Sequence, residues 1–192
     1  MNKTLIIDEH PNKESFNDAL TKAYIKGAEN ADAEIKVITI RELLFDSNLA
    51  IGYEKNTVLD SDIVEAQEKI KWADHLFWIH PVWWGGLPAI TKAFIDRVFL
   101  PGFGIKSRDK SVAMDNLSTQ KTAHIITTLD QPSWYYWLVY GKPSVNHLKE
   151  STLEFCGMKP VKVTYVGPIK KAKESCINKW LTQVEQMGMK HA

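Results

Sequence analysis

The chain has 192 residues, which predicts a single domain spanning residues 1–192 at the usual ~150 residues per domain. Hydrophobic residues make up 44% of the chain and charged residues 24%, a balance that excludes intrinsic disorder. The 24 Lys and Arg residues against 23 Asp and Glu residues give a formal net charge of +1. A charge this small does not by itself recruit nucleic acid or a membrane surface.

The predicted elements alternate between strands and helices along the whole chain. Short apolar runs rich in branched residues predict buried strands, and apolar residues at helical spacing predict helices. Strands are expected at Lys3–Asp8, Glu34–Ile40, His75–His80, Lys121–Thr128 and Pro160–Val166. Helices are expected at Phe16–Asn30, Asp62–Ala73, Pro88–Phe99, Val145–Cys156 and Glu174–Met187, with a polar loop at 45–60.

Five strands alternating with five helices indicate an α/β fold with a parallel sheet covered on both faces. We predict a three-layer doubly wound sheet of five parallel strands in the order 2-1-3-4-5, with a Rossmann-type order as the alternative. In either order, ligands bind beyond the carboxyl ends of the strands. The segments after the first, third and fourth strands are therefore the candidate site.

The segment after the first strand has the features of an anion site. It contains His10, reaches Ser15 at the predicted start of a helix, and continues into Asn17. A helix N-terminus offers unpaired backbone N–H groups and about half a positive charge. The side chains of these three residues would complete a phosphate cradle, while simple helix capping by Ser15 is the alternative.

Two adjacent tryptophans follow the third strand. Trp83 and Trp84 stand between Pro81-Val82 and Gly85-Gly86. Burying one such side chain removes about 150–250 Å² from water, which at ~25 cal/mol per Å² is worth several kcal/mol. We therefore expect the pair to pack on a partner or to wall a flat ligand. The alternative is a hydrophobic patch buried by neighbouring loops.

A second aromatic segment follows the fourth strand. Thr127-Thr128 ends that strand, Leu129-Asp130 follows, and four consecutive aromatics occupy 134–137. Aromatic walls on two adjacent strand ends, with an anion site on a third, fit a flat ring that carries a phosphate tail. A flavin is such a molecule.

The sequence resembles the flavodoxin-like NAD(P)H:quinone oxidoreductases, the group of DT-diaphorase and the bacterial modulator of drug activity proteins. The most specific segment is Pro81-Val82-Trp83-Trp84-Gly85-Gly86-Leu87-Pro88-Ala89-Ile90, followed by Lys92, Phe94, Asp96-Arg97-Val98 and Gly102-Phe103. The Ser-Phe-Asn at 15–17 is similar to the phosphate loop of that family. The resemblance covers nearly the whole chain and implies a flavodoxin-like fold.

The resemblance also implies roles for individual residues. Ser15, Phe16 and Asn17, with His10 alongside, would hold the flavin phosphate. Pro81, Val82, Trp83, Trp84 and Gly85 would line the isoalloxazine, and Thr127, Thr128, Leu129 and Asp130 would form a second flavin loop. Tyr135 falls at the position of a family tyrosine near the reduced ring and is the candidate catalytic residue. Trp134 and Tyr135 would contact the substrate.

Two departures from the family pattern affect the acceptor side of the site more than the flavin side. Leu129-Asp130 replaces a Gly-Gly pair, and a family histidine falls at Gly141, with His147 nearby in sequence. A carboxylate ~4 Å from a reduced, anionic flavin would cost about 4 kcal/mol at an effective dielectric of 20. We therefore predict that Asp130 points away from the ring, toward solvent or a basic partner.

Three polar residues outside these loops have simpler predicted roles. His124 lies within a strand and is expected to be a satisfied core histidine. His80 ends the third strand, could orient the tryptophan segment, and receives no catalytic role. Asp96 and Arg97 form either a local ion pair or a solvated helix face.

The function implied is flavin-dependent NAD(P)H:quinone oxidoreduction, or reduction of a related flat aromatic acceptor, by ping-pong hydride transfer. FMN is expected, because the chain has no counterpart of the long C-terminal extension of the animal enzymes, with FAD as the alternative. The resemblance further implies a homodimer with the site at its interface, in agreement with the surplus of aromatics. No metal, nucleic acid or membrane span is expected, and the two cysteines, without CxxC or zinc spacing, fit a cytoplasmic protein.

The sequence also allows other classes of function to be compared with an oxidoreductase. A flavin-binding ancillary subunit of a transport system, with little turnover of its own, is the main alternative. Flavodoxin-type electron carriers are usually acidic, which this chain is not. A phosphorelay receiver needs an Asp at the end of the third strand, where His80-Pro81 stands. Dinucleotide-fingerprint, Walker A, HExxH and GxSxG motifs are all lacking.

Overall fold

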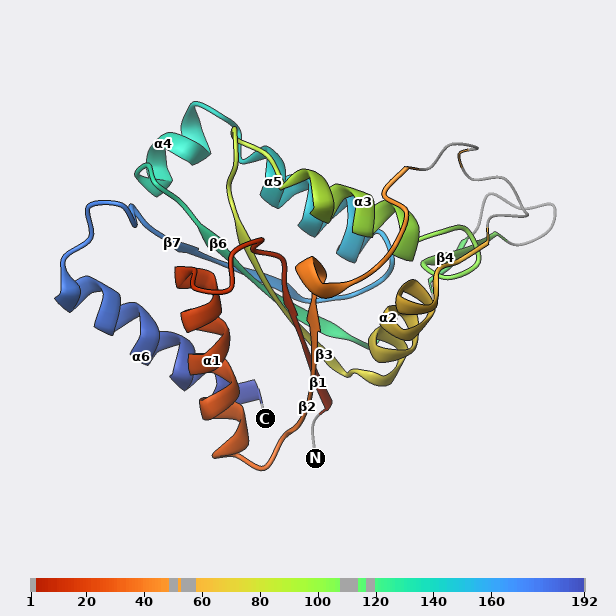
Figure 1. The fold of residues 1–192 in the computed structure, drawn as a ribbon, viewed down its shortest axis with the longest axis horizontal. Coiled ribbons are helices and arrows are strands. Elements are labelled where there is room, and N and C mark those ends of the chain that lie inside the picture. Colours follow the sequence, from red (N-terminus) through yellow and green to blue (C-terminus); the bar gives the residue numbers. More distant parts are fainter. Residues whose placement is uncertain (1–2, 49–51, 53–57, 108–113, 117–119, 192) are drawn as a thin grey trace.

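The computed structural model describes residues 3–48, 52, 58–107, 114–116 and 120–191 (Figure 1). Its centre is a five-stranded sheet of β1 (Lys3–Asp8), β2 (Glu34–Thr39), β3 (His75–Pro81), β6 (Thr122–Thr128) and β7 (Val161–Val166). The strand order is β2-β1-β3-β6-β7, and every neighbouring pair is parallel. The predicted order 2-1-3-4-5 is confirmed, and the Rossmann-type alternative is wrong.

Helices cover both faces of the sheet (Figure 1). On one face α1 (Phe16–Glu29) and α6 (Glu174–His191) pack together over Phe77 and Ile79 of β3. The other face is covered by α2 (Ser61–Trp72), α3 (Ala89–Val98) and a π-helical segment, η2 (His147–Glu154). The short α5 (Pro143–Asn146) leads directly into η2.

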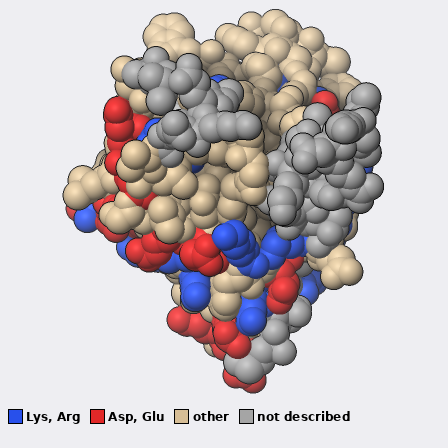
Figure 2. Space-filling model, turned by 90° about the vertical axis from the view of Figure 1, so that its right-hand side faces the viewer, with Lys and Arg blue, Asp and Glu red and all other residues tan. Residues whose placement is uncertain are grey.

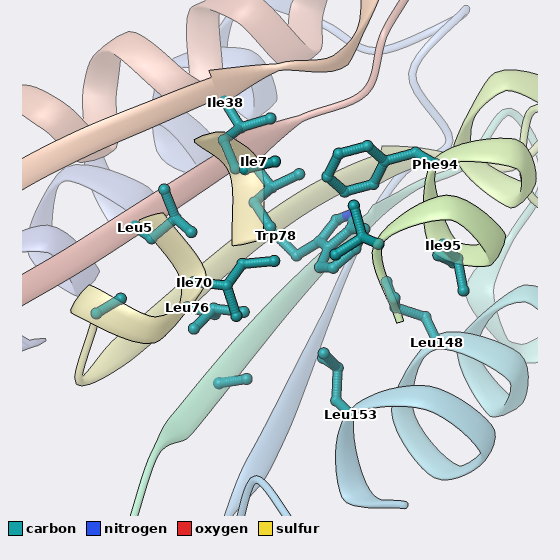
Figure 3. Close-up of a cluster of buried hydrophobic side chains, with 14 of the residues drawn as sticks. Leu5, Ile7, Ile38, Ile70, Leu76, Trp78, Phe94, Ile95, Leu148 and Leu153 are labelled. Carbon is teal, nitrogen blue, oxygen red and sulfur yellow. The ribbon is translucent and has the colours of Figure 1, made fainter. Parts of the chain in front are cut away.

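The central strand β3 explains why the sheet is enclosed. All seven of its residues are buried, as expected of a parallel strand with helices on both sides. Because side chains alternate along a strand, Trp78 packs in the cluster beneath α2 and α3 with Phe94 and Leu148 (Figure 3). Phe77 faces the opposite side and stacks on Tyr24 of α1, with ring centroids 3.6 Å apart.

The layer formed by α1 and α6 depends on two glycines at which the helix backbones meet. A Cβ added to Gly27 would lie 1.9 Å from the carbonyl oxygen of Glu185. A Cβ added to Gly188 would lie 2.3 Å from the carbonyl oxygen of Tyr24. Real Cβ atoms do not approach backbone oxygens so closely, so only glycine permits this helix spacing.

Several local features differ from the sequence-based expectation. The helix expected at 145–156 begins at Pro143 and is π-helical over His147–Glu154, where the Thr152 hydroxyl donates to the carbonyl of His147 five residues earlier at 3.0 Å. Pro88 is the N-cap of α3 instead of lying in its first turn. The expected loop at 45–60 lies partly outside the described residues.

Four further elements were not predicted at all. They are η1, a 3-10 turn at Ile40–Glu42, α4 at Ser133–Leu138, and a hairpin of β4 (Ile105–Ser107) and β5 (Met114–Asn116). These are short, and their sequences lack the long periodic patterns that identify helices and strands. Of them, α4 and η1 bear on the candidate site.

Asp96 and Arg97, which are adjacent on α3, bond to different residues. Arg97 is buried and donates to a carboxylate oxygen of Asp60 at 2.8 Å. Asp96 accepts from Lys92, four residues earlier on the same helix face. Neither bond is the expected pairing of Asp96 with Arg97. The alternative of a solvated helix face holds for the partly exposed Asp96 but not for the buried Arg97, because successive residues on a helix point in different directions.

No helix in the described ranges has the length and apolar character needed to cross a membrane.

Candidate functional site

The carboxyl ends of β1, β3 and β6 bring three loops to one edge of the sheet (Figure 1). The register aligns Asp8 with Ile79 and Pro81 with Thr128. The segments that follow these residues therefore start side by side, although they are about 70 and 50 positions apart in the sequence. Val82 continues the connection, since its backbone N–H donates to the carbonyl of Thr128 at 3.0 Å.

The loop from β1 to α1 is held by side chains that accept from backbone N–H groups slightly further along the chain. Asp8 accepts from the N–H of His10 at 3.1 Å, and His10 Nδ1 accepts from Asn12 at 3.1 Å. Asn12 in turn accepts from Glu14 at 3.0 Å. Such short-range bonds define a loop conformation without regular structure. Because Nδ1 of His10 is an acceptor here, its ring proton lies on Nε2.

The first turn of α1 carries an unpaired donor. Ser15 is the N-cap and its hydroxyl accepts from the N–H of Asp18 at 3.2 Å. Asn17 is buried, and its Oδ1 accepts from the hydroxyl of Thr128 at 2.8 Å. The Nδ2 group of Asn17 is buried without a hydrogen-bond partner among the described residues. An unpaired buried amide costs about 1–3 kcal/mol, and it lies where the helix N-terminus favours an anion.

Helix capping and anion binding are compatible at this position. Ser15 performs the cap that the alternative reading expected. Phe16 directs its ring away from the loop, against Trp180 of α6 at 6.0 Å between centroids. Its contribution to a ligand is therefore limited to its backbone N–H.

Arg41, which the sequence analysis missed, links η1 to this loop. Its guanidinium donates to Asp8 Oδ2 at 2.7 Å and to the carbonyl of His10 at 2.9 Å. It also lies 3.7 Å from a carboxylate oxygen of Asp18. The charge of Arg41 thus offsets two carboxylates next to the helix N-terminus, which would otherwise repel an anion.

The tryptophan segment forms a tight turn. Trp83 and Gly86 exchange backbone hydrogen bonds of 3.1 and 2.9 Å, and the central residues Trp84 and Gly85 have φ angles of 51° and 78°. Positive φ at both central positions is the type I′ pattern. A tryptophan is strained in this region of φ, and strained residues concentrate at functional sites.

The turn exposes its aromatic side chains. Trp84 is fully exposed and Trp83 is 44% exposed. The reading in which neighbouring loops bury both rings is therefore wrong. Trp83 also meets His10 edge-on, with ring centroids 6.0 Å apart, so the tryptophan turn and the β1–α1 loop touch.

The two threonines at the end of β6 have their hydroxyls engaged within the protein. Thr128 donates to Asn17, and Thr127 lies 3.0 Å from Nε2 of His80. Leu129 is buried and packs with Tyr136 and Val145, so it offers only backbone groups to a ligand. Asp130 is exposed, and its carboxylate accepts from the N–H of Lys170 at 3.2 Å. The carboxylate of Asp130 is thus hydrogen-bonded to the backbone of the segment that follows β7.

Helix α4 presents aromatic side chains beside the tryptophan turn. Trp134 is 61% exposed and Tyr135 is 37% exposed, with ring centroids 5.8 Å apart. Tyr140 packs on Tyr135 at 5.7 Å and lies so close to Gly85 that an added Cβ would be 3.0 Å from its ring. The turn and α4 therefore form one aromatic surface.

This surface contains further exposed apolar residues: Trp137, Leu138 and Val139. We call the whole set the aromatic edge; it comprises Trp83, Trp84, Trp134, Tyr135, Trp137, Leu138, Val139 and Tyr140. Figure 2 shows the side of the molecule opposite to α4, and on that visible face most Lys, Arg, Asp and Glu side chains lie in the lower half. An exposed apolar set of this size is a candidate binding surface.

Behind the aromatic edge lies a buried polar cluster that includes Glu9, which the sequence analysis also missed. Glu9 and His80 are both fully buried, with 3.7 Å between Oε1 of Glu9 and Nδ1 of His80. A lone Glu after a strand ordinarily indicates a solvated loop, so no sequence pattern singled it out. His124 behaves as predicted: it is buried, with Nε2 2.8 Å from the hydroxyl of Thr164.

The fold and the site together define the class of protein. The chain matches the model of the flavodoxin-like fold family over residues 2–187, and it belongs to that family. The resemblance to its NAD(P)H:quinone oxidoreductases is confirmed by the names of several relatives.

Two curated relatives illustrate the match. The chain is 30% identical over 122 residues to the ribosyldihydronicotinamide dehydrogenase-like protein traD of Penicillium crustosum, covering 53% of this chain and 45% of that protein. It is 28% identical over 184 residues to NAD(P)H dehydrogenase (quinone) 1 of Cavia porcellus, covering 82% of this chain and 65% of that protein. The chain thus spans less than two thirds of the length of either relative.

Solved structures agree with the fold over nearly the whole chain. Smu.1420 from Streptococcus mutans UA159 superposes with a TM-score of 0.84 at 30% identity, covering 98% of this chain and 99% of that one. An FMN-dependent NADH-azoreductase from Bacillus anthracis, solved in complex with FMN, superposes with a TM-score of 0.73 at 15% identity, covering 99% of each chain. At that identity the second likeness concerns the fold alone.

Proposed function

We propose that this chain is a flavin-dependent NAD(P)H oxidoreductase whose acceptor is a quinone or a related flat aromatic molecule. One observation carries the proposal: the buried Nδ2 of Asn17, which has no partner among the residues described, stands at the N-terminus of α1, beside a turn that exposes Trp83 and Trp84. To bind a flavin nucleotide, a protein needs hydrogen-bond donors for the phosphate and a broad aromatic surface for the ring. The relatives named as NAD(P)H and quinone dehydrogenases support the same reaction class.

FMN is the proposed cofactor, and its phosphate would bind at the first turn of α1. Nδ2 of Asn17 and the backbone N–H groups of Phe16 and Asn17 would donate to it, with the Ser15 hydroxyl alongside. Arg41 serves this site by offsetting the negative charges of Asp8 and Asp18. FAD, the alternative, would use the same phosphate position.

The ring would be lined by residues of the tryptophan turn and of the segment after β6. Bound flavin supplies hydride chemistry, accepting from NAD(P)H and reducing the quinone. Pro81 and Val82 would contribute backbone, while Trp83, Trp84 and Trp134 would provide flat walls for the nicotinamide or the acceptor in turn. That shared surface is the basis for proposing ping-pong kinetics. The hydroxyl of the half-exposed Tyr135 would donate toward the charge that develops on the reduced ring.

The position of Asp130 supports this arrangement. Its carboxylate accepts from the backbone of Lys170 and is therefore oriented by the β7 side of the edge. We propose that it stays clear of the pyrimidine end of the ring, where its charge would oppose reduction.

We further propose that the chain forms a homodimer through the aromatic edge. Leu138 is 66% exposed and Trp137 is 55% exposed, on the same helix as the proposed substrate contacts. Aromatic residues are enriched at the centres of protein interfaces. A dimer would bury these side chains and complete the walls of two symmetric sites.

The direct experiment is an absorbance spectrum of the purified chain, followed by mass identification of any yellow cofactor released on denaturation. We expect flavin bands and the mass of FMN. Steady-state oxidation of NAD(P)H with a quinone should then give parallel double-reciprocal lines. Colourless protein that binds neither FMN nor FAD at micromolar concentration would overturn the proposal. Flavin binding without quinone turnover would instead identify an ancillary flavin subunit.

A further inference from the structure

Helix α4 lies at the periphery of the molecule, beyond the carboxyl end of β6 (Figure 1). Five of its six residues are exposed, and Tyr136 is fully buried. The ring of Tyr136 packs with Leu129 and Val145 in a small apolar cluster. The burial of this one side chain therefore attaches to the body of the protein a helix whose other aromatic side chains belong to the aromatic edge.

The hydroxyl of Tyr136 reaches the tryptophan turn. It donates to the carbonyl of Gly85 at 3.2 Å, across 51 positions of the sequence. Gly85 is buried, although Trp83 and Trp84, which precede it, are exposed, and a buried carbonyl needs a donor. Because an element with few buried contacts opens easily, this bond makes up a large part of the attachment between the turn and α4.

Ser144, at the start of α5, sets the orientation of the phenol. The hydroxyl oxygen of Tyr136 accepts from the backbone N–H of Ser144 at 3.1 Å and lies 2.6 Å from the Ser144 hydroxyl. A carbonyl can only accept, so Tyr136 gives its single proton to Gly85, and the Ser144 hydroxyl is the donor in the shorter contact. The reverse direction would take this donor away from a buried carbonyl. Ser144 is buried as well, so protein groups order the phenol.

Tyr140 adds a second contact between the same two segments. Its ring covers Gly85 so closely that an added Cβ would lie 3.0 Å from the nearest ring atom. The ring of Tyr140 also meets those of Tyr135 and Tyr136, with centroids 5.7 and 6.3 Å apart. Gly85 therefore meets the α4 segment through one hydrogen bond and one aromatic ring, and the hydrogen bond is the directional part of the contact.

We propose that Tyr136 is a positioning residue of the site: its bond to Gly85 holds α4 against the tryptophan turn and fixes the spacing of two aromatic walls. One wall carries Trp83 and Trp84, and the other carries Trp134. With the bond in place, the turn and α4 open and close as one unit. The use of these walls by a flat, quinone-class acceptor rests on the proposed function, whereas the coupling of the two segments does not.

The substitution Tyr136→Phe tests the coupling, because it keeps the buried ring and removes the hydroxyl. Amide hydrogen exchange of the full chain follows the two segments separately. Gly86 reports on the turn, and Val139, whose N–H donates to the carbonyl of Tyr135 at 2.9 Å, reports on the end of α4. We expect exchange at both amides to be at least about fivefold faster than in the wild type, the effect of losing one hydrogen bond.

Tyr24→Phe is the matched control. Tyr24 is also fully buried, but it stacks on Phe77 at the face of the sheet that α1 and α6 cover. Loss of its hydroxyl acts on overall stability and not on the local opening of the turn or of α4, so Gly86 and Val139 should exchange at the wild-type rate. Wild-type exchange at Gly86 in Tyr136→Phe, or equal acceleration by the two variants, would refute the coupling.

A second measurement follows the site itself, through steady-state kinetics of the flavin-loaded protein with a 1,4-naphthoquinone as acceptor. In Tyr136→Phe we expect the KM for the quinone to rise by up to about fivefold, because the closed arrangement is less populated, and kcat to stay within about twofold of the wild type. A role of Tyr136 in ring packing alone would move neither value. Faster exchange with an unchanged KM would refute the spacing of the walls. A protein without flavin or turnover would refute the proposed function alone, since the exchange measurement needs neither.

Discussion

Helix α1 takes part in two regions of the molecule that differ in how closely they are packed. Along its length, α1 packs against α6 so closely that Gly27 and Glu185 meet backbone to backbone. At its N-terminus, the same helix faces the aromatic edge, where large apolar side chains remain exposed and the buried amide of Asn17 has no hydrogen-bond partner in the part of the chain that the structure describes. The first region has no space for an added atom, whereas the second leaves polar and aromatic groups without a partner among the described residues.

This difference shows how stability and binding are separated in the molecule. The layer of α1 and α6 buries Leu20, Tyr24 and Val184 and stabilises the fold by close packing. The aromatic edge forgoes the several kcal/mol that burial of its rings would provide. Substitutions in the layer should therefore change the free energy of unfolding, and substitutions at the edge should change affinity.

The largest effect is expected for Gly27→Ala. The new Cβ would meet the carbonyl of Glu185 at a distance that forces the helices apart, and we expect a loss of about 3 kcal/mol in the free energy of unfolding. Gly86→Ala is the matched control, because its Cβ would lie 3.8 Å from the nearest atom, the carbonyl oxygen of Trp83. Urea unfolding of both variants measures the difference. Equal stabilities would show that the α1–α6 contact can relax.

A smaller effect, measured as a loss of FMN affinity, is expected for Asn17→Ala. Loss of a hydrogen bond to a charged group costs about 2 kcal/mol, so the affinity for FMN should fall about thirtyfold. Riboflavin, which lacks the phosphate, should lose far less, and Asn30→Ala at the other end of α1 should leave both affinities unchanged. Fluorescence titration with the two flavins distinguishes the cases. A parallel loss for both would mean that Asn17 acts through its bond to Thr128 and not through the phosphate.

The same contrast explains what could be predicted from the sequence. The strands were predictable because enclosed parallel strands, such as His75–Pro81, are continuous apolar runs. Trp83 and Trp84 were identifiable because two rings after a strand end cannot both be covered by the sheet. Asn17 was predicted as a phosphate ligand, and its unpaired amide supports that prediction without testing it.

The residues that escaped prediction act through distant partners. Arg41 meets Asp8 across 33 positions, and Glu9 meets Trp78 and Thr91 across 69 and 82 positions. No local pattern records such contacts, and an isolated Glu or Arg in a sequence ordinarily indicates a solvated surface. Helix α4 was missed because its six residues are too short for a periodic pattern.

The smallest effect, and the one that tests the aromatic edge as an interface, is expected for Leu138→Asp. A charge placed at the centre of the proposed dimer contact must be desolvated on association, and symmetry places it there twice. We expect the dimer dissociation constant to rise at least about tenfold, equivalent to ~1.4 kcal/mol, as measured by sedimentation equilibrium. Val64→Asp is the matched control, since Val64 is also an exposed apolar residue but lies on α2. A wild-type chain that is monomeric at micromolar concentration would contradict the interface, and so would equal weakening by both variants. In the first case the edge would have to be assigned to its ligands alone, and Trp137 and Leu138 would lose their proposed role.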